Sequence, residues 1–362
     1  MILPLIILAD SNLSIGAGHA MRSIAVAQEW ILRGGRVQFL ASDMLEHVRC
    51  KIDQSGAQLK LFSVQDYCEQ VTKILSKSGP IWVWLDGYHF KEDWIHEVYQ
   101  LSNVRLGIMD DGMDRDFYHA DLVVNQNPYA KAEDYLDKSS SGSKFLMGTH
   151  YCLLRNEFLN FDHDQNHDQN HDQAQNQDQA QKSQEENESF KVLLTLGGSS
   201  INPWVNHLLK WIAEIETHLR LELVVIADNL KEWEGIQLQN GCFSVIPAQD
   251  NFSRWVEWSD LAITAAGATL WELMNKRVPC VTCTIADNQR MNAEHLNKLG
   301  AIVHLGDART WDPESVKQKL KLIFNDPEQR TILQEKGNHL VDGMGRQRVV
   351  KEMLKIVDLD EN

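Results

Sequence analysis

Long apolar runs are missing from this 362-residue chain, and so is any excess of basic residues. No run approaches the roughly 18 apolar residues of a membrane helix. Residues 1–8 are apolar but lack a basic leader and a small-residue cleavage site, so we expect a first β-strand and not a signal peptide. The formal net charge of −16 argues against nucleic-acid and anionic-membrane partners, because both need a basic surface.

Cysteine is sparse and scattered along the chain. The six cysteines fit a reducing compartment, so we expect a cytoplasmic protein. Cys280 and Cys283 form a C-x-x-C pair inside a strand-like segment, whereas a redox pair belongs at a helix start, where the dipole lowers the thiol pKa. We therefore assign this pair no redox or metal role.

The apolar content of 43% is typical of a globular protein, and the length suits two domains. Short apolar runs alternate with helix-length segments, which predicts parallel strands covered on both faces. The pattern occurs once in residues 1–160 and again in residues 190–362, and it predicts an α/β protein with two Rossmann-like domains facing across a cleft. The predicted strands are residues 3–8, 37–41, 81–85, 106–109, 122–125, 192–196, 221–226, 243–246, 261–264, 278–282 and 302–304.

Residues 161–189 form an acidic, low-complexity segment between the two predicted domains. The sequence His-Asp-Gln-Asn repeats there, and eight acids stand against one base between Asp162 and Glu188. Its three histidines recur every four residues and would align as metal ligands on a helix. The composition favours a flexible, solvated linker, because it offers almost nothing to bury.

The loop after the first predicted strand carries Gly16, Gly18, His19 and Arg22. It is not a dinucleotide fingerprint, because Met21 occupies the third glycine position, and it is not a P-loop. His19 falls in the first helical turn, where the positive dipole end disfavours the imidazolium, so we expect a neutral general base. Arg22 shares that face and can hold a carboxylate or phosphate. In the alternative interpretation, His19 only packs or caps.

Glycine and small residues also follow two strands of the second domain, at Gly197, Gly198, Ser199, Gly267, Ala268 and Thr269. Main-chain N–H groups at such helix starts bind anions. Glu272, one turn into its helix, is suited to accepting the protons of two ribose hydroxyls, and segment 286–289 supplies further amides. Together these loops predict a diphosphate site, although strand-ending glycines and a capping glutamate would give the same pattern.

Taken in order, these motifs resemble the UDP-sugar hydrolases of pseudaminic acid biosynthesis. That family has the GT-B fold and is related to the lipid-II-forming N-acetylglucosaminyltransferase. The resemblance covers both predicted domains and omits the linker. The segments that carry it are Ile15-Gly-Ala-Gly-His-Ala-Met-Arg, Asp86-Gly-Tyr, Met109-Asp-Asp, Asn125-Gln-Asn, Tyr151-Cys-Leu-Leu-Arg-Asn-Glu-Phe, Leu196-Gly-Gly-Ser, Ser259-Asp-Leu-Ala-Ile, Ala266-Gly-Ala-Thr-Leu-Trp-Glu and Asp287-Asn-Gln.

The resemblance implies a UDP-linked 2,4-diacetamido-2,4,6-trideoxy sugar as substrate, with water replacing UDP at the anomeric carbon. His19 matches the family's proposed base, and Tyr88 matches a position that lines the sugar. Ser200 stands where the family usually has aspartate after Gly-Gly-Ser, which is a departure from the pattern. Further substrate contacts are expected at Asp86, Asn125, Arg155, Ile246, Glu272, Asn288 and Gln289.

We expect neither a cofactor nor a metal, because UDP is a good leaving group and needs stabilisation more than a strong acid. The Asp110-Asp111 pair suits Mg²⁺, but a structural or sugar-hydroxyl role is favoured. Oligomeric partners are left open, and so is whether the last predicted helix, about residues 347–357, packs on the first domain. Three other functions remain open as well: a UDP-sugar-dependent glycosyltransferase of the same fold, a hydrolysing 2-epimerase, and a nucleotide-sugar-binding protein without turnover.

Overall fold

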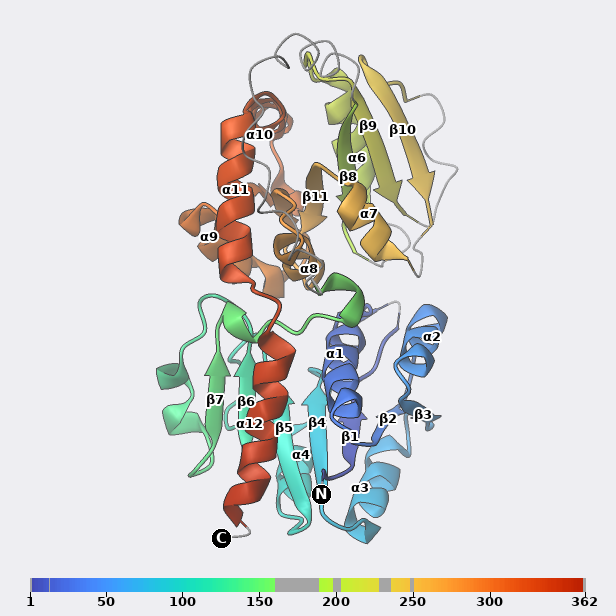
Figure 1. Ribbon diagram of the computed structural model, residues 1–362, viewed down its shortest axis with the longest axis vertical. Helices are drawn as coiled ribbons and strands as arrows, with labels where there is room; N and C mark the ends of the chain where they lie inside the picture. Colours follow the sequence, from blue (N-terminus) through green and yellow to red (C-terminus); the bar gives the residue numbers. More distant parts are fainter. Residues whose placement is uncertain are drawn as a thin grey trace, which may run out of the picture.

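A computed structural model describes residues 2–12, 14–159, 189–197, 203–227, 236–247 and 251–360. The described chain forms two α/β units placed end to end, each built on its own sheet (Figure 1). The expected α/β fold with two Rossmann-like domains is therefore confirmed. The expected linker lies outside the described residues, apart from Ser189.

In the described residues the first sheet has seven parallel strands in the order β3-β2-β1-β4-β5-β6-β7. This order reverses direction next to β1, and such switch points are where open α/β sheets bind ligands, at the carboxyl ends of the strands. The strands are β1 (Leu5–Leu8), β2 (Val37–Ala41), β3 (Gln58–Leu61), β4 (Ile81–Asp86), β5 (Val104–Met109), β6 (Leu122–Asn125) and β7 (Lys144–Met147).

The second sheet repeats this plan with six parallel strands in the described residues, in the order β10-β9-β8-β11-β12-β13. The strands are β8 (Phe190–Thr195), β9 (Leu221–Ile226), β10 (Gly241–Ile246), β11 (Leu261–Ala265), β12 (Cys280–Thr284) and β13 (Val303–Asp307). Every predicted strand occurs. Two further strands, β3 and β7, were not predicted, and both lie at the edges of the first sheet.

Helices cover both faces of each sheet (Figure 1). In the first domain, α1, α2 and α12 share one buried cluster, and α3 and α4 belong to the other. No helix in the described part of the chain is long and apolar enough to cross a bilayer. The helices are α1 (Gly18–Leu32), α2 (Glu46–Gln54), α3 (Tyr67–Lys77), α4 (Glu92–Tyr99), α6 (Pro203–Glu214), α7 (Phe252–Trp258), α8 (Thr269–Asn275), α9 (Arg290–Leu299), α10 (Pro313–Asn325), α11 (Pro327–Leu340) and α12 (Gly345–Asp360).

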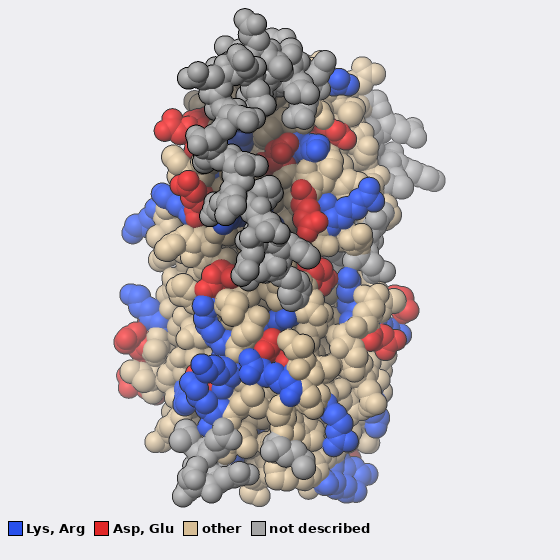
Figure 2. All heavy atoms as spheres, in the orientation of Figure 1, with Lys and Arg blue, Asp and Glu red and all other residues tan. Residues whose placement is uncertain are grey.

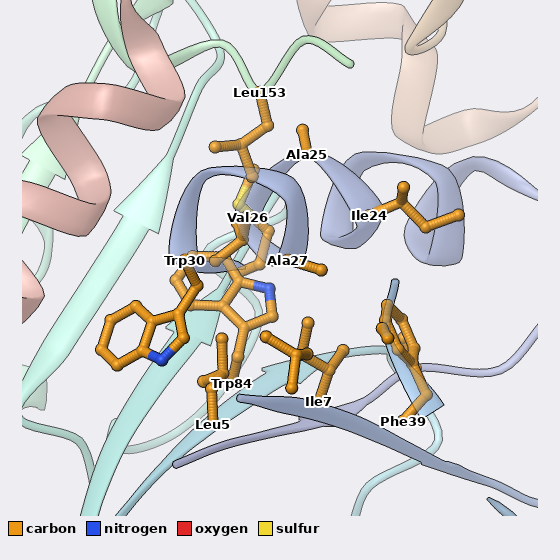
Figure 3. Close-up of a cluster of buried hydrophobic side chains, with 14 of the residues drawn as sticks. Leu5, Ile7, Ile24, Ala25, Val26, Ala27, Trp30, Phe39, Trp84 and Leu153 are labelled. Atoms are coloured by element: carbon orange, nitrogen blue, oxygen red, sulfur yellow. The ribbon is translucent and has the colours of Figure 1, made fainter. Parts of the chain in front are cut away.

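Helix α1 is fixed on the first sheet by buried aromatic side chains. Trp30 packs with Leu5 and Trp84 from the strands beneath it (Figure 3). Its indole Nε1–H donates to the carbonyl oxygen of Leu3 at 3.0 Å. Each large apolar side chain buried in this way contributes about 1.5–3 kcal/mol. This packing holds the first turn of α1, which contains His19, at the carboxyl end of the sheet.

The chain crosses between the domains in two segments, residues 152–159 and 341–345. Cys152, Phe158 and Val341 belong to a buried cluster of the second domain. After the second crossing, α12 returns to the first domain, where Val349 and Met353 share a buried cluster with α1 (Figure 1). The two crossings meet at Gly345, where an added Cβ would overlap the carbonyl oxygen of Cys152.

We expect Gly345→Ala to destabilise the protein by about 1–3 kcal/mol, because the backbone of Cys152 cannot yield as a flexible side chain would. Thermal unfolding followed by circular dichroism measures the effect. Gly79→Ala is the matched control, since a Cβ at Gly79 meets no described atom within 4 Å. Equal melting temperatures for both variants would show that the crossings are not tightly packed.

Candidate active site

A cavity of about 370 Å³ lies between the two domains, at the carboxyl ends of central strands from both sheets. Its volume falls within the range of small-molecule sites, about 300–1,000 Å³. The structure brings most of the predicted site residues to its wall. Those that line it are Gly16, Gly18, His19, Arg22, Tyr88, Arg155, Gly197, Gly267, Ala268, Thr269, Glu272, Asn288 and Gln289.

Three of the predicted substrate-binding residues do not line the cavity. Asp86 is buried behind His19 and Arg22. Asn125 is also buried, and its Nδ2 donates to the Tyr135 hydroxyl at 2.8 Å. Ile246 packs at the edge of a second-domain cluster and is not part of the cavity wall. Gly198 and Ser199 lie outside the described residues.

His19 is oriented by Asp86, the last residue of β4. His19 Nδ1 lies 2.7 Å from Asp86 Oδ1. Burial would raise the pKa of Asp86, but Arg22 and His19 hold it below its usual range, so this carboxylate is ionised and only accepts. Arg22 Nη2 also lies 3.1 Å from Nδ1, but the ionised carboxylate is the nearer partner and cannot donate. We therefore assign the proton to Nδ1. In the neutral ring, Nε2 is then the nitrogen that keeps a lone pair.

Arg22 lies between two carboxylates, one turn after His19 on α1. Its Nε donates to Asp86 Oδ2 at 2.7 Å, and its Nη1 donates to Asp111 Oδ1 at 2.8 Å. Nη2 donates to the other oxygen of each carboxylate. Burial opposes the charge of Asp111, but Arg22 holds the pKa of this carboxyl well below its usual range. The guanidinium that we expected to bind a substrate anion is thus engaged by the protein's own carboxylates.

Tyr88 lies at the cavity wall, where it contacts both Asp111 and His19. Its hydroxyl donates to Asp111 Oδ2 at 2.7 Å, and its ring meets the His19 ring edge-on, with centroids 4.8 Å apart. Burial and the nearby charge of Asp111 raise the pKa of Tyr88. Tyr88 is therefore a neutral hydroxyl at the cavity wall, and it restricts rotation of the imidazole.

Sequence reasoning did not include several residues of the cavity wall. Gln126 and Asn127 line it, and both belong to a motif that carried the family resemblance. Asp111 lines it as well, and from the sequence this residue is expected only as one of a pair with a structural or sugar-hydroxyl role. The position of these residues directly after β5 and β6 was the available signal. His47 and Lys51 of α2 also line the cavity, and nothing in their helical spacing indicated that α2 reaches it.

On the second-domain side, the cavity is lined by turns that follow β8, β11 and β12. Gly197 has a φ of +98°, a conformation that favours glycine. Thr269 is the first residue of α8, and the Gln289 side chain is held by the Ile285 N–H, which donates to its Oε1 at 3.0 Å. Glu272 of α8 accepts from Arg155 Nη2 at 2.8 Å.

The Asp110-Asp111 pair is split between two environments. Asp111 pairs with Arg22, whereas Asp110 accepts a hydrogen bond from the Tyr135 hydroxyl at 2.7 Å. Burial raises the pKa of Asp110. Among the described residues, no group of three or more His, Cys, Asp or Glu side chains is arranged to hold a metal ion. Cys280 and Cys283 are buried in β12, and burial raises the pKa of both thiols.

We expect the free energy of unfolding to fall as the pH is lowered from about 5 toward 2, because Asp86 and Asp111 have lowered pKa values in the fold and the unfolded chain then binds more protons. Arg22→Met should cost about 3–5 kcal/mol at pH 7, where it leaves two buried charges unpaired. Urea unfolding at pH 7, pH 4 and pH 2 measures both effects. The deficit of the variant should shrink at pH 4, as the carboxylates become protonated.

The control for this prediction is an exposed ion pair. Basic and acidic side chains lie near one another over both domains on the face shown in Figure 2. Arg348 pairs with Asp342 at 2.6 Å, and both side chains are more than one-third exposed. Arg348→Met should cost less than about 1 kcal/mol. A deficit for Arg22→Met that is the same at all three pH values would contradict the role of the buried carboxylates.

Residues 192–350 match the family model of the glycosyltransferase family 28 C-terminal domain. Over 337 residues, the chain is 25% identical to the uncharacterized protein MJ1062 of Methanocaldococcus jannaschii. That alignment covers 88% of this chain and 64% of the relative, so this chain spans less than two thirds of the relative's length.

Among the solved structures that resemble this chain over both domains are the following two. MurG of Acinetobacter baumannii is 16% identical, with a TM-score of 0.64 over 98% of this chain and 99% of that one. A putative UDP-N-acetylglucosamine 2-epimerase of Listeria monocytogenes is 11% identical, with a TM-score of 0.66 over 99% and 97%. The chain therefore has a glycosyltransferase-like GT-B fold, and its second domain matches the glycosyltransferase family 28 C-terminal domain.

Proposed function

We propose that this protein hydrolyses a UDP-linked 2,4-diacetamido-2,4,6-trideoxy sugar to the free sugar and UDP, as a step of pseudaminic acid biosynthesis. The motifs around His19, Asp86 and Glu272 support this substrate through their family resemblance. The GT-B fold supports nucleotide-sugar chemistry in general, and one solved relative with this fold is named for UDP-N-acetylglucosamine.

The observation that carries the proposal is the His19–Asp86 pair at the wall of the interdomain cavity. Because Asp86 accepts a hydrogen bond from the Nδ1–H, Nε2 is the nitrogen available to accept a proton from water. Asp86 then stabilises the imidazolium that forms, much as a buried carboxylate does beside a catalytic histidine.

The reaction balances without a further reactant. The oxygen of water forms a bond to the anomeric carbon, and the bond from that carbon to the diphosphate oxygen breaks. The water proton passes to His19 Nε2, and the electron pair leaves with UDP. Attack opposite the leaving group inverts the anomeric carbon.

The second domain supplies the binding site for the nucleotide in this proposal. Main-chain N–H groups near Gly197, Ala268 and Thr269 bind the diphosphate, and such fixed donors stabilise charge that grows as the bond breaks. Glu272 accepts hydrogen bonds from the ribose hydroxyl groups. Asn288 and Gln289 lie at the cavity wall beside these groups.

The cavity wall argues against the epimerase alternative. An epimerase of the hydrolysing type needs acid and base carboxylates at the sugar. Among the described residues of the wall, the carboxylates are Asp111 and Glu272, and each is paired with an arginine, Arg22 and Arg155 respectively. Glycosyl transfer remains the main competitor, because it would use the same nucleotide site.

We expect His19→Ala to lower turnover by about 10²–10⁴-fold while UDP binding persists, because the variant loses the base but keeps the second-domain site. Released UDP measures turnover, and calorimetry measures binding. His96→Ala is a control, since His96 lies exposed on α4, outside the cavity wall. Unchanged turnover in His19→Ala would falsify the base assignment.

Incubation without an acceptor tests the reaction class. UDP release and the anomer formed are followed by nuclear magnetic resonance for a panel of UDP-sugars with and without the 2,4-diacetamido pattern. The proposal expects UDP release from the diacetamido sugar, with inversion. Release that begins only when a sugar or lipid acceptor is added would show a glycosyltransferase. Tight UDP binding without release from any sugar, with or without acceptor, would show a binding protein.

A further inference from the structure

Four charged side chains connect the two domains at one end of the cavity. Arg155 lies in the first crossing segment, and its Nη2 donates to Glu272 Oε1 of α8 at 2.8 Å. Its Nη1 lies 2.9 Å from Glu157 Oε1, and Lys51 of α2 donates to the same oxygen at 3.2 Å. A continuous chain of ion pairs therefore runs from the first domain, through the crossing, to the carboxylate that we assign to the ribose.

Glu272 is poorly suited to carry a negative charge without help. Its side chain is 12% exposed, and burial raises its pKa. Arg155 opposes that rise most strongly, Lys51 opposes it further, and Glu157 adds to it. The net pKa still lies above the usual range for a glutamate. Protonation would replace an acceptor by a donor, and the group would then no longer accept hydrogen bonds from two hydroxyl groups equally.

Glu272 can accept the hydrogen bond from Arg155 and still accept hydrogen bonds from a ribose. An ionised carboxylate offers about four acceptor positions, and Arg155 occupies one of them on Oε1. The two Nη atoms of Arg155 are committed to Glu272 and Glu157, and its guanidinium lies over the Phe158 ring at 5.0 Å. Its Nε is buried and has no hydrogen-bond partner among the described residues. Both Nη atoms are thus directed at protein carboxylates, and the Nε–H is not.

We propose that Arg155 is a positioning residue for nucleotide binding: it orients Glu272 and keeps it ionised, and it does not itself bind the substrate. This inference rests on the proposed function, which places the UDP ribose at Glu272. The planar fork of arginine suits the task, because it reaches two carboxylates at once, whereas a lysine offers a single point charge. Its place in the crossing segment makes the nucleotide site depend on the junction of the domains.

A double-mutant cycle tests this inference. UDP affinity is measured by calorimetry at pH 6 and pH 8 for the wild type, Arg155→Met, Glu272→Gln and the double variant. Arg155→Met should weaken binding about 10-fold at pH 6, because Glu272 loses the donor that orients it and its ionised form becomes less favoured. The loss should be smaller at pH 8, because the pKa of Glu272 rises without Arg155 and a higher pH restores the carboxylate. In the Glu272→Gln background, Arg155→Met should change the affinity less than about twofold.

Two further variants keep the test decisive. Arg348→Met removes an arginine near the second crossing but outside the cavity wall, and it should leave UDP affinity unchanged at both pH values. Arg155→Lys keeps a charge and should bind UDP more tightly than Arg155→Met at pH 6. If Arg155→Met does not fold, the same cycle is run with Arg155→Lys.

Equal losses from the Arg155 substitution in both backgrounds would overturn the inference and place Arg155 in direct contact with the substrate. A loss that is the same at pH 6 and pH 8 would overturn it as well, because a purely structural role does not change the ionisation of Glu272. A wild-type protein that binds no UDP would defeat the proposed function itself. UDP binding by the wild type together with an additive cycle would defeat only this inference.

Discussion

A single buried guanidinium organises the first-domain side of the cavity. Arg22 makes four charge-assisted hydrogen bonds, two to Asp86 and two to Asp111. Taking such ions out of water costs several kcal/mol per ion, and only a close, well-aligned arrangement offsets that cost. The ends of α1, β4 and β5 are therefore held in one relative position. Asp86 in turn orients His19, and Asp111 orients Tyr88, so the geometry of the proposed base depends on Arg22.

The proposed chemistry is divided between two sheets of similar topology. The first domain carries the imidazole and its partners, and the second domain carries the turns that line the opposite wall. Neither half completes the site by itself, so the crossings between them bear on function. Gly345 lets the two crossing segments approach closely, and Arg155, in the first of them, reaches the second domain at Glu272. The close backbone packing at Gly345 and the Arg155–Glu272 ion pair therefore both lie at the junction of the two domains.

The central strands could be predicted from the sequence because burial on both faces makes them continuously apolar. Strand β4, Ile81–Asp86, is buried along its whole length. The edge strands β3 and β7 were missed because exposure at an edge permits polar residues, as in the sequence Gln-Leu-Lys-Leu of β3. The return of α12 to the first domain was left open by the sequence, since an amphipathic helix does not specify which apolar surface it covers. The contacts of Val349 and Met353 with the α1 cluster settle that position.

The sequence by itself determined the alternation of apolar runs and helices, the glycine turns after the strands, and the position of His19 in the first turn of α1. These features are local, because backbone sterics and helix dipoles act over a few residues. Only the tertiary structure decided which partners these residues have. Arg22 meets Asp86 and Asp111 across 64 and 89 residues of chain, and Arg155 meets Glu272 across 117. Contacts of that range exist only after strand order and domain packing have brought the carboxyl ends of separate strands together.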